Sequence, residues 1–208
     1  LADYRNWALG FSVLFLSRIL GLQYFMNDID DTTIASRSRK HLVYNTIPFL
    51  ACFLTFLISL LFANGWAVDP TTGVISVEPF KYLHNLLAIP VIAAMLLVGV
   101  LAVLWGIGTG IFKGSRKSIW FSGGGAVLTV LSLLLLAGFN NTAYYPSLSD
   151  MQSSLTIYNS SSSLFTLEAM SIVSIFIPFV VAYIWYSWRA MNRKPITRQE
   201  IESDDHLY

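Results

Sequence analysis

Positive charge in this chain is concentrated in three short stretches, and long apolar runs separate them. Ten of the 13 Lys and Arg residues belong to these stretches: Arg37, Arg39, Lys40, Lys113, Arg116, Lys117, Arg189, Arg193, Lys194 and Arg198. A soluble protein would spread its positive charge over its whole surface. The pattern indicates a chain that crosses a bilayer several times and keeps its basic groups on one side.

The composition supports a membrane protein. Of the 208 residues, 55% are hydrophobic and 12% are charged, whereas soluble domains carry about a quarter of charged residues. The basic groups are too small for a nucleic-acid interface. The single Cys52 excludes a disulfide framework and is typical of a small buried apolar residue. Because the chain opens on Leu1 without an initiator Met, we expect it to be the interior of a longer protein.

Five runs are long enough to cross a hydrocarbon core, which requires about 20 apolar residues in a helix. They cover about residues 7–26, 42–66, 86–112, 119–139 and 169–188. The runs are continuous rather than alternating, so they predict helices and not a closed barrel. The predicted fold is an all-α integral membrane protein, in which residues 1–188 belong to a larger multi-helix bundle. Residues 189–208 are expected to form a tail with a short helix.

Three prolines fall within these runs, at Pro48, Pro90 and Pro178. In a membrane bundle a proline in this position predicts a kink rather than the end of the helix.

The loops predict the orientation. The loop 27–41, the turn 113–118 and the tail carry the basic stretches, whereas the loops 67–85 and 140–168 share one Lys. Five crossings place these two sets on opposite sides, so the positive-inside rule predicts an outer amino end and a cytoplasmic carboxyl end. The polar 140–165 loop is expected to pack over the outer mouth of the bundle.

Arg18 is the candidate functional residue, because a charge inside a membrane span is functional by default. It lies eight residues, or about 12 Å, from the inner end of the first span. Two roles of Arg18 remain as alternatives. It packs against a partner subunit, or it belongs to a proton path or contacts a quinone head group. A carboxylate, a carbonyl or a lipid phosphate could serve as its partner. We expect no other buried polar residue in the spans.

Other residues offer little for catalysis. None of His41, His84 and His206 lies deep in a span or shares a helix face with another, so we expect no haem ligation, and Met95 and Met170 are expected to be packing residues. Glu168 is expected to open the fifth helix, and no acidic residue lies mid-membrane. We expect the 123–125 glycine run to allow close helix approach. No catalytic, cofactor-binding or metal-binding residue is predicted.

The carboxyl-terminal sequence resembles a known family. The resemblance rests on Tyr145-Pro146, on the run Ser154-Leu155-Thr156-Ile157-Tyr158-Asn159, and on the aromatic and basic group at residues 185–189. The end of the chain adds Ile196-Thr197, Glu200-Ile201-Glu202 and Leu207-Tyr208. These features are similar to the end of subunit II of bacterial cytochrome bd quinol oxidase, over about residues 138–208.

This resemblance implies the carboxyl-terminal half of a non-haem membrane subunit, which belongs to a quinol:oxygen oxidoreductase of the bacterial inner membrane. Haem b, haem d and the quinol site would belong to a partner subunit I, and a small single-helix subunit is a further expected partner. The chain itself would bind no cofactor. The alternative is half of a secondary transporter or a membrane scaffold: the prolines within the runs favour it, and the expected scarcity of buried polar residues opposes it.

Overall fold

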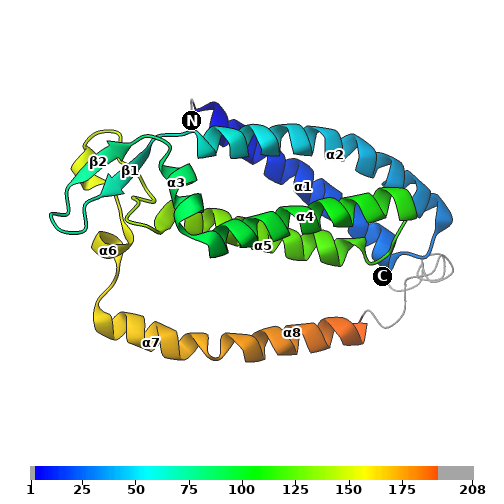
Figure 1. Cartoon of the computed structure of the whole chain (residues 1–208). Coiled ribbons are helices and arrows are strands. Elements are labelled where there is room, and N and C mark those ends of the chain that lie inside the picture. Colours follow the sequence, from blue (N-terminus) through cyan, green and yellow to red (C-terminus); the bar gives the residue numbers. More distant parts are fainter. Residues whose placement is uncertain (1–2, 192–208) are drawn as a thin grey trace.

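The computed structural model describes residues 3–191, which form an all-α membrane protein with one small β-hairpin (Figure 1). Five helical segments are long and apolar enough to cross a membrane, as the sequence predicts. The long helices are α1 (Tyr4–Asp28), α2 (Thr32–Leu61), α4 (Pro90–Lys113) and α5 (Ser118–Gly138), and α7 (Leu164–Ser174) with α8 (Ile177–Met191) forms the fifth segment. The shorter elements are β1 (Gly65–Val68), β2 (Ile75–Glu78), α3 (Lys81–Ala88), η1 (Met151–Ser153) and α6 (Ile157–Ser160).

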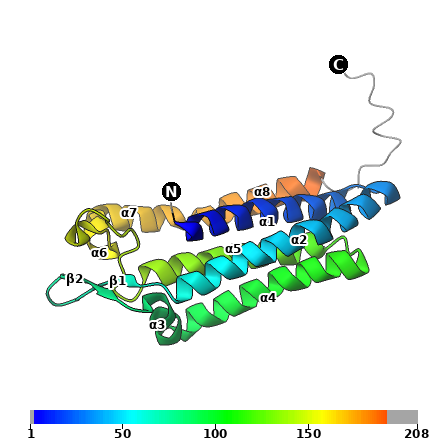
Figure 2. The same cartoon turned by 90° about the horizontal axis from the view of Figure 1, so that it is seen from above.

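Helices α1, α2, α4 and α5 form a four-helix core (Figures 1 and 2). The most extensive packing joins α1 to α2 and α4 to α5. The apolar centre is contributed by three of the helices and consists of Ile19, Leu42, Phe49, Val103 and Ile107.

Helices α4 and α5 pack along a seam of small residues. Its members recur in alternating steps of four and three residues: Ile92, Leu96, Gly99, Val103, Gly106 and Gly110 on α4, and Ser118, Ser122, Gly125, Thr129, Ser132 and Leu136 on α5. This heptad spacing keeps one face of each helix against the other. Gly125 lies so close to α4 that an added Cβ would be 2.7 Å from both the Gly99 carbonyl oxygen and the Val103 nitrogen. Of the three glycines expected to allow close approach, only Gly125 faces α4, because Gly123 and Gly124 face open space.

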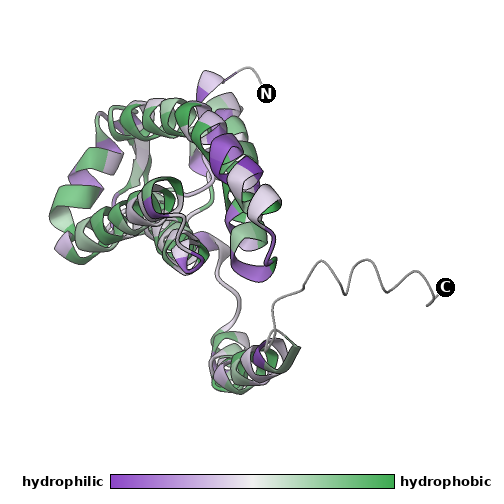
Figure 3. Cartoon of the chain, turned by 90° about the vertical axis from the view of Figure 1, so that its right-hand side faces the viewer, coloured by the Kyte–Doolittle hydropathy of each residue, from purple (hydrophilic) through white to green (hydrophobic). Residues whose placement is uncertain are grey.

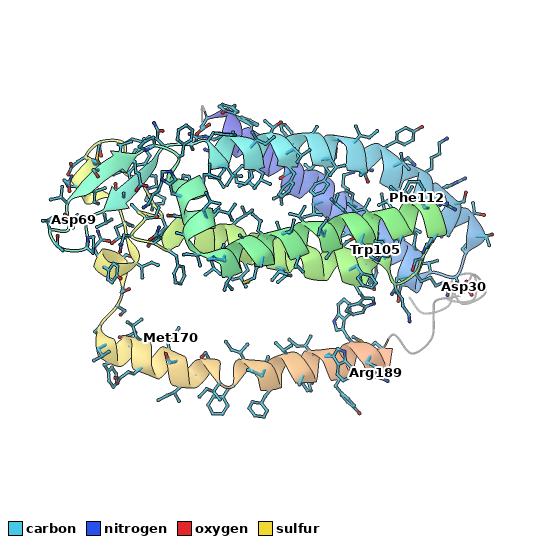
Figure 4. All side chains as sticks on the ribbon, in the orientation of Figure 1. Asp30, Asp69, Trp105, Phe112, Met170 and Arg189 are labelled. Atoms are coloured by element: carbon cyan, nitrogen blue, oxygen red, sulfur yellow. The ribbon has the colours of Figure 1, made fainter. Side chains whose placement is uncertain are left out.

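The basic residues 37–40 and 113–117 and Arg189, the described residue of the third basic stretch, lie at the same end of the molecule. Figure 4 places Asp30, Phe112 and Arg189 at one end and Asp69, in the hairpin, at the other. We call the first the basic end, defined by residues 37–40, 113–117 and 189, and the second the hairpin end, defined by residues 64–88 and 139–163. The alternation of connections rich and poor in Lys and Arg therefore corresponds to the two ends of the bundle.

The second helix differs from its predicted bounds of 42–66. It begins at Thr32, because the Asp31 carboxylate caps the backbone N–H groups of Thr33 and Ile34, and the basic residues 37–40 are therefore helical rather than a loop. It ends at Leu61, and β1 then pairs with β2 in an antiparallel hairpin. The predicted loop at residues 67–85 therefore contains β2 and the start of α3.

The third predicted run, 86–112, consists of two helices. Pro90 is at the first turn of α4, where its missing N–H costs nothing, and Ile89 alone separates it from α3. Pro90 thus starts a helix instead of kinking one. Pro48, by contrast, lies inside α2.

The fifth segment stands apart from the core. Neither α7 nor α8 contains a buried residue, and Figure 3 shows them separated from the other helices. The segment is interrupted at Ile175 and Phe176, because Pro178 cannot donate to the preceding turn. Glu168 is in the second turn of α7 and does not open the helix. The expected tail helix lies outside the described residues.

The 140–165 loop packs beside the hairpin. Thr142 forms a β-bridge with Ala67, and Tyr145 forms one with Leu155. The Gln152 side chain accepts from the backbone N–H of Ile75 and donates to its carbonyl oxygen. The loop and hairpin together close this end of the bundle.

Gly125→Ala tests the close approach of α4 and α5, and Gly124→Ala is its matched control. A Cβ at position 125 would clash with the α4 backbone, whereas one at position 124 meets nothing within 4 Å. We expect Gly125→Ala to cost about 1–3 kcal/mol and to lower the unfolding temperature of the purified protein in detergent. Equal unfolding temperatures for the two variants would contradict the packing described.

Candidate functional site

Arg18 lies on the exposed outer face of α1, near the middle of the span. It forms no ion pair or hydrogen bond with any residue that the structure describes. Its neighbours on this face are Phe11, Leu14 and Phe25, all large and exposed, and Gly21, beside which an added Cβ would meet nothing within 4 Å. Arg18 therefore points away from the four-helix core.

The expectation that the spans bury no other polar residue was wrong. The interior contains Ser12, Gln23, Ser38, Asn45, Ser118, Ser122, Thr129 and Ser132. Several of them donate to carbonyls of their own helix, as Asn45 does to His41 and Thr129 to Gly125. Small hydroxyl residues satisfied in this way lose little on burial.

Gln23, Ser118 and Ser122 differ from the other buried polar residues. Their side chains are fully buried, and none has a hydrogen-bond partner within the described residues. All three belong to helices that pack on each other, α1 and α5. They add unpaired polar groups to the half of the core nearer the basic end, but none of them can carry a charge.

The histidines of the described chain cannot share one metal or haem. His41 is an exposed residue of α2 near the basic end, and His84 belongs to α3 at the hairpin end. His206 lies outside the described residues. Met95 is half-buried on α4, and Met170 is exposed on α7. No group of three or more His, Cys, Asp or Glu residues within the described range could hold a metal ion.

An apolar cavity of about 300 Å³ lies between the four core helices. Its walls carry no His, Met or Cys: they consist of Leu9, Ser12, Val13, Leu16, Phe49, Leu50, Phe53, Leu54, Leu57, Val100, Val103, Leu104, Ala126, Thr129, Val130 and Leu133. A haem iron needs an axial ligand from one of these absent types, or from Tyr. The cavity thus has no residue that could bind haem through its iron.

Asn85 connects α3 to the end of α5. Its fully buried amide donates to the Leu136 carbonyl at 3.1 Å and to the Thr142 hydroxyl at 2.8 Å, and its oxygen accepts from the Asn140 side chain at 2.9 Å. The Leu136 carbonyl is in the last turn of α5, where intrahelical donors are lacking. Asn140 and Asn141 have positive φ angles of 57° and 53°, which turn the chain toward Asn85.

An ionic cluster joins α3 to the hairpin. Glu78, the last residue of β2, accepts from the buried Lys81 ammonium at 2.8 Å and contacts the exposed His84 ring at 2.8 Å. The hydrogen bonds from Lys81 and then His84 lower the pKa of Glu78. Sequence inspection missed this cluster and Asn85, although a lone Lys three residues after Glu78 was a signal.

At the basic end, Arg39 of α2 donates to the carbonyls of Ile111 and Phe112 in the last turn of α4. Arg116 pairs with Asp30. The guanidinium of Arg39 thereby donates to carbonyls at the end of α4, which lack donors from their own helix. Its positive charge also interacts favourably with the negative end of the α4 dipole. Arg37, Lys40, Lys113 and Lys117 are exposed at the same end and form no ion pair with any residue from 3 to 191.

These features define a multi-span helical membrane protein. Its sequence matches the model of the family described as Cytochrome bd terminal oxidase subunit II over residues 1–191. The chain belongs to this family and is therefore a subunit of a respiratory terminal oxidase. A search of curated proteins found no match. The match confirms the resemblance seen in the carboxyl-terminal sequence and extends it through the core helices.

Asn85→Leu tests the connection between α3 and α5. The matched control is Asn64→Leu, which changes an exposed Asn directly before β1. The change at position 85 leaves the buried Thr142 hydroxyl and the Leu136 carbonyl without their donor, at a cost of about 1–3 kcal/mol for each group. We expect Asn85→Leu to lower the unfolding temperature and Asn64→Leu to leave it unchanged. A similar effect of both substitutions would show that the hydrogen bonds of Asn85 do not matter.

The Glu78 cluster predicts a pH dependence at the hairpin end. Because folding lowers the pKa of Glu78, its contribution to stability is present above the unfolded value of about 4.3 and is lost as the pH falls through the lower folded value. We expect wild type to be more stable than Glu78→Gln at pH 7, and the difference to shrink below about pH 4. Unfolding temperatures measured from pH 7 to pH 3 would check this. A difference that stays constant over that range would contradict it.

Proposed function

We propose that this chain is the non-haem membrane subunit of a bacterial quinol:oxygen oxidoreductase and supports a haem-bearing subunit while quinol is oxidised and dioxygen is reduced to water. The observation that carries the proposal is the fifth segment, 28 residues long, of which no residue is buried within the chain. Its aromatic and aliphatic side chains are exposed, and Figure 3 shows the segment apart from the other helices. In an assembled complex such a segment is available to pack against other helices.

The residues of the core also support a chain that leaves haem binding to a partner subunit. The central cavity offers no axial ligand, and the histidines at positions 41 and 84 are on different elements at opposite ends. We infer that haem b and haem d are bound by the partner subunit I. A small single-helix subunit is a further candidate to cover part of the exposed surface.

Arg18 has a place in this proposal. A charged side chain at the centre of a span costs about 3 kcal/mol or more if it stays unpaired in lipid, and Arg18 faces outward beside an open Gly21. We infer that a group from the rest of the complex pairs with Arg18. Packing of this kind would locate α1 against its neighbour without giving the chain a catalytic role.

The positive-inside rule supports an orientation in the bacterial inner membrane with the basic end in the cytoplasm. Arg37, Lys40, Lys113 and Lys117 are all exposed at that end. The hairpin end, whose only described Lys is paired with Glu78, would then face the periplasm. The carboxyl terminus follows α8 on the cytoplasmic side.

The two interrupted helices do not support the alternative of a transporter. Transporters use helix breaks to expose backbone groups around a substrate site at the bilayer midplane. Here the α3–α4 break lies at the hairpin end, and the residues of the α7–α8 break, Ile175 and Phe176, are exposed. The two breaks therefore do not frame a common polar site.

The purified oxidase complex containing this chain provides the test. We expect the complex to consume dioxygen with quinol as donor and to show haem absorption, and the purified chain alone to show no haem absorption. Arg18→Gln is expected to reduce the amount of assembled complex recovered from membranes, whereas Arg37→Gln, which replaces an exposed cation of the basic end, is not. Stoichiometric haem in the isolated chain would overturn the proposal.

A further inference from the structure

A long apolar groove follows the outer face of α4 toward the basic end. Its volume is about 750 Å³, and its lining consists of Val98, Leu101, Ala102, Leu104, Trp105, Gly108, Thr109, Phe112 and Lys113. Trp105 and Phe112, both labelled in Figure 4, are large exposed side chains, and Gly108 lies between them in the sequence. An added Cβ at Gly108 would meet nothing within 4 Å, so the groove exists because this position has no side chain.

The groove lies mostly outside the α4–α5 seam, which uses Gly99, Val103 and Gly106. It borders that seam at Ala102, which lies beside Gly125 of α5. From Val98 to Lys113 the helix rises about 22 Å, which is more than the depth of one leaflet in a hydrocarbon core about 30 Å thick. An acyl chain that enters from the basic end therefore fits along it.

Lys113 closes the groove at the basic end. It is the last residue of α4, it is exposed, and it has no ion-pair partner within residues 3–191. The carbonyls around it would repel an anion, but Arg39 donates to those of Ile111 and Phe112. The Ser115 backbone N–H satisfies the carbonyl of Thr109. The combination leaves a cation beside an apolar groove with most of the opposing dipole neutralised.

We propose that this groove, the α4 groove, binds an anionic phospholipid, with an acyl chain along Leu101, Trp105 and Gly108 and the phosphate at Lys113. Charge complementarity selects the lipid: the free cations at this end favour an anionic head group, and basic pockets beside membrane helices bind such lipids. Trp105 is suited to the region below the head group, where aromatic residues gather. The site depends on the membrane location of the chain and not on its role in the oxidase.

Two pairs of variants in the purified complex distinguish a specific lipid site in the α4 groove from nonspecific attraction to surface charge. Lys113→Gln removes the cation of the groove, and Lys117→Gln removes another exposed cation that does not line it. Gly108→Leu fills the groove, and Gly123→Leu adds the same side chain at another open glycine on α5. The probe is phosphatidylglycerol added to delipidated complex, with phosphatidylcholine as the zwitterionic comparison, and native mass spectrometry counts the bound lipids.

We expect wild type to retain phosphatidylglycerol in preference to phosphatidylcholine. Lys113→Gln should weaken this retention roughly fivefold, the effect of about one surface cation, while Lys117→Gln leaves it unchanged. Gly108→Leu should abolish retention of both lipids, and Gly123→Leu should not.

Three outcomes would overturn the proposal. Equal retention of the two lipids by wild type would show that Lys113 selects no head group. Equal losses from Lys113→Gln and Lys117→Gln would assign the effect to diffuse surface charge. Loss of subunit assembly in Gly108→Leu but not in Gly123→Leu would show that a protein helix, and not a lipid, covers the α4 groove.

Discussion

The close approach of α4 and α5 is the contact on which the four-helix core depends. Lipid tails are as apolar as the side chains that face them, so the hydrophobic effect does little to bring membrane helices together, and close packing has to replace it. Gly99, Gly106 and Gly125 allow this packing, and hydroxyl residues of α5 fill the seam without adding bulk. The second helix pair, α1 with α2, then encloses the apolar centre around Ile19 and Leu42.

The membrane spans could be predicted from sequence because a bilayer imposes a length and a polarity on every helix. Their ends were harder to predict. Asp31 starts α2 ten residues earlier than the apolar pattern indicates, since a helix continues beyond the lipid wherever a cap and good hydrogen bonds allow it. Pro90 was interpreted as a kink, but its position at the first turn of α4 makes it a start signal. The hairpin depends on pairing between residues 65–68 and 75–78, which hydropathy does not report.

The candidate site was only partly predictable. Arg18 stands out in any hydropathy profile, and the structure adds that it faces outward, away from the rest of the chain. Asn85 and Lys81 did not stand out, because the burial of a polar residue depends on which distant groups meet it; for Asn85 these are Leu136, Asn140 and Thr142. The seam of α5 was readable in principle, since its small residues repeat at heptad spacing from Ser118 to Leu136. Of the glycine run at 123–125, only Gly125 belongs to this seam.

The separation of α7 and α8 from the core has a consequence for a copy of the chain on its own. The four core helices enclose the apolar centre within residues 4–138. The last segment follows a folded loop and buries no residue against them. An isolated copy therefore exposes its final helix to lipid on all sides.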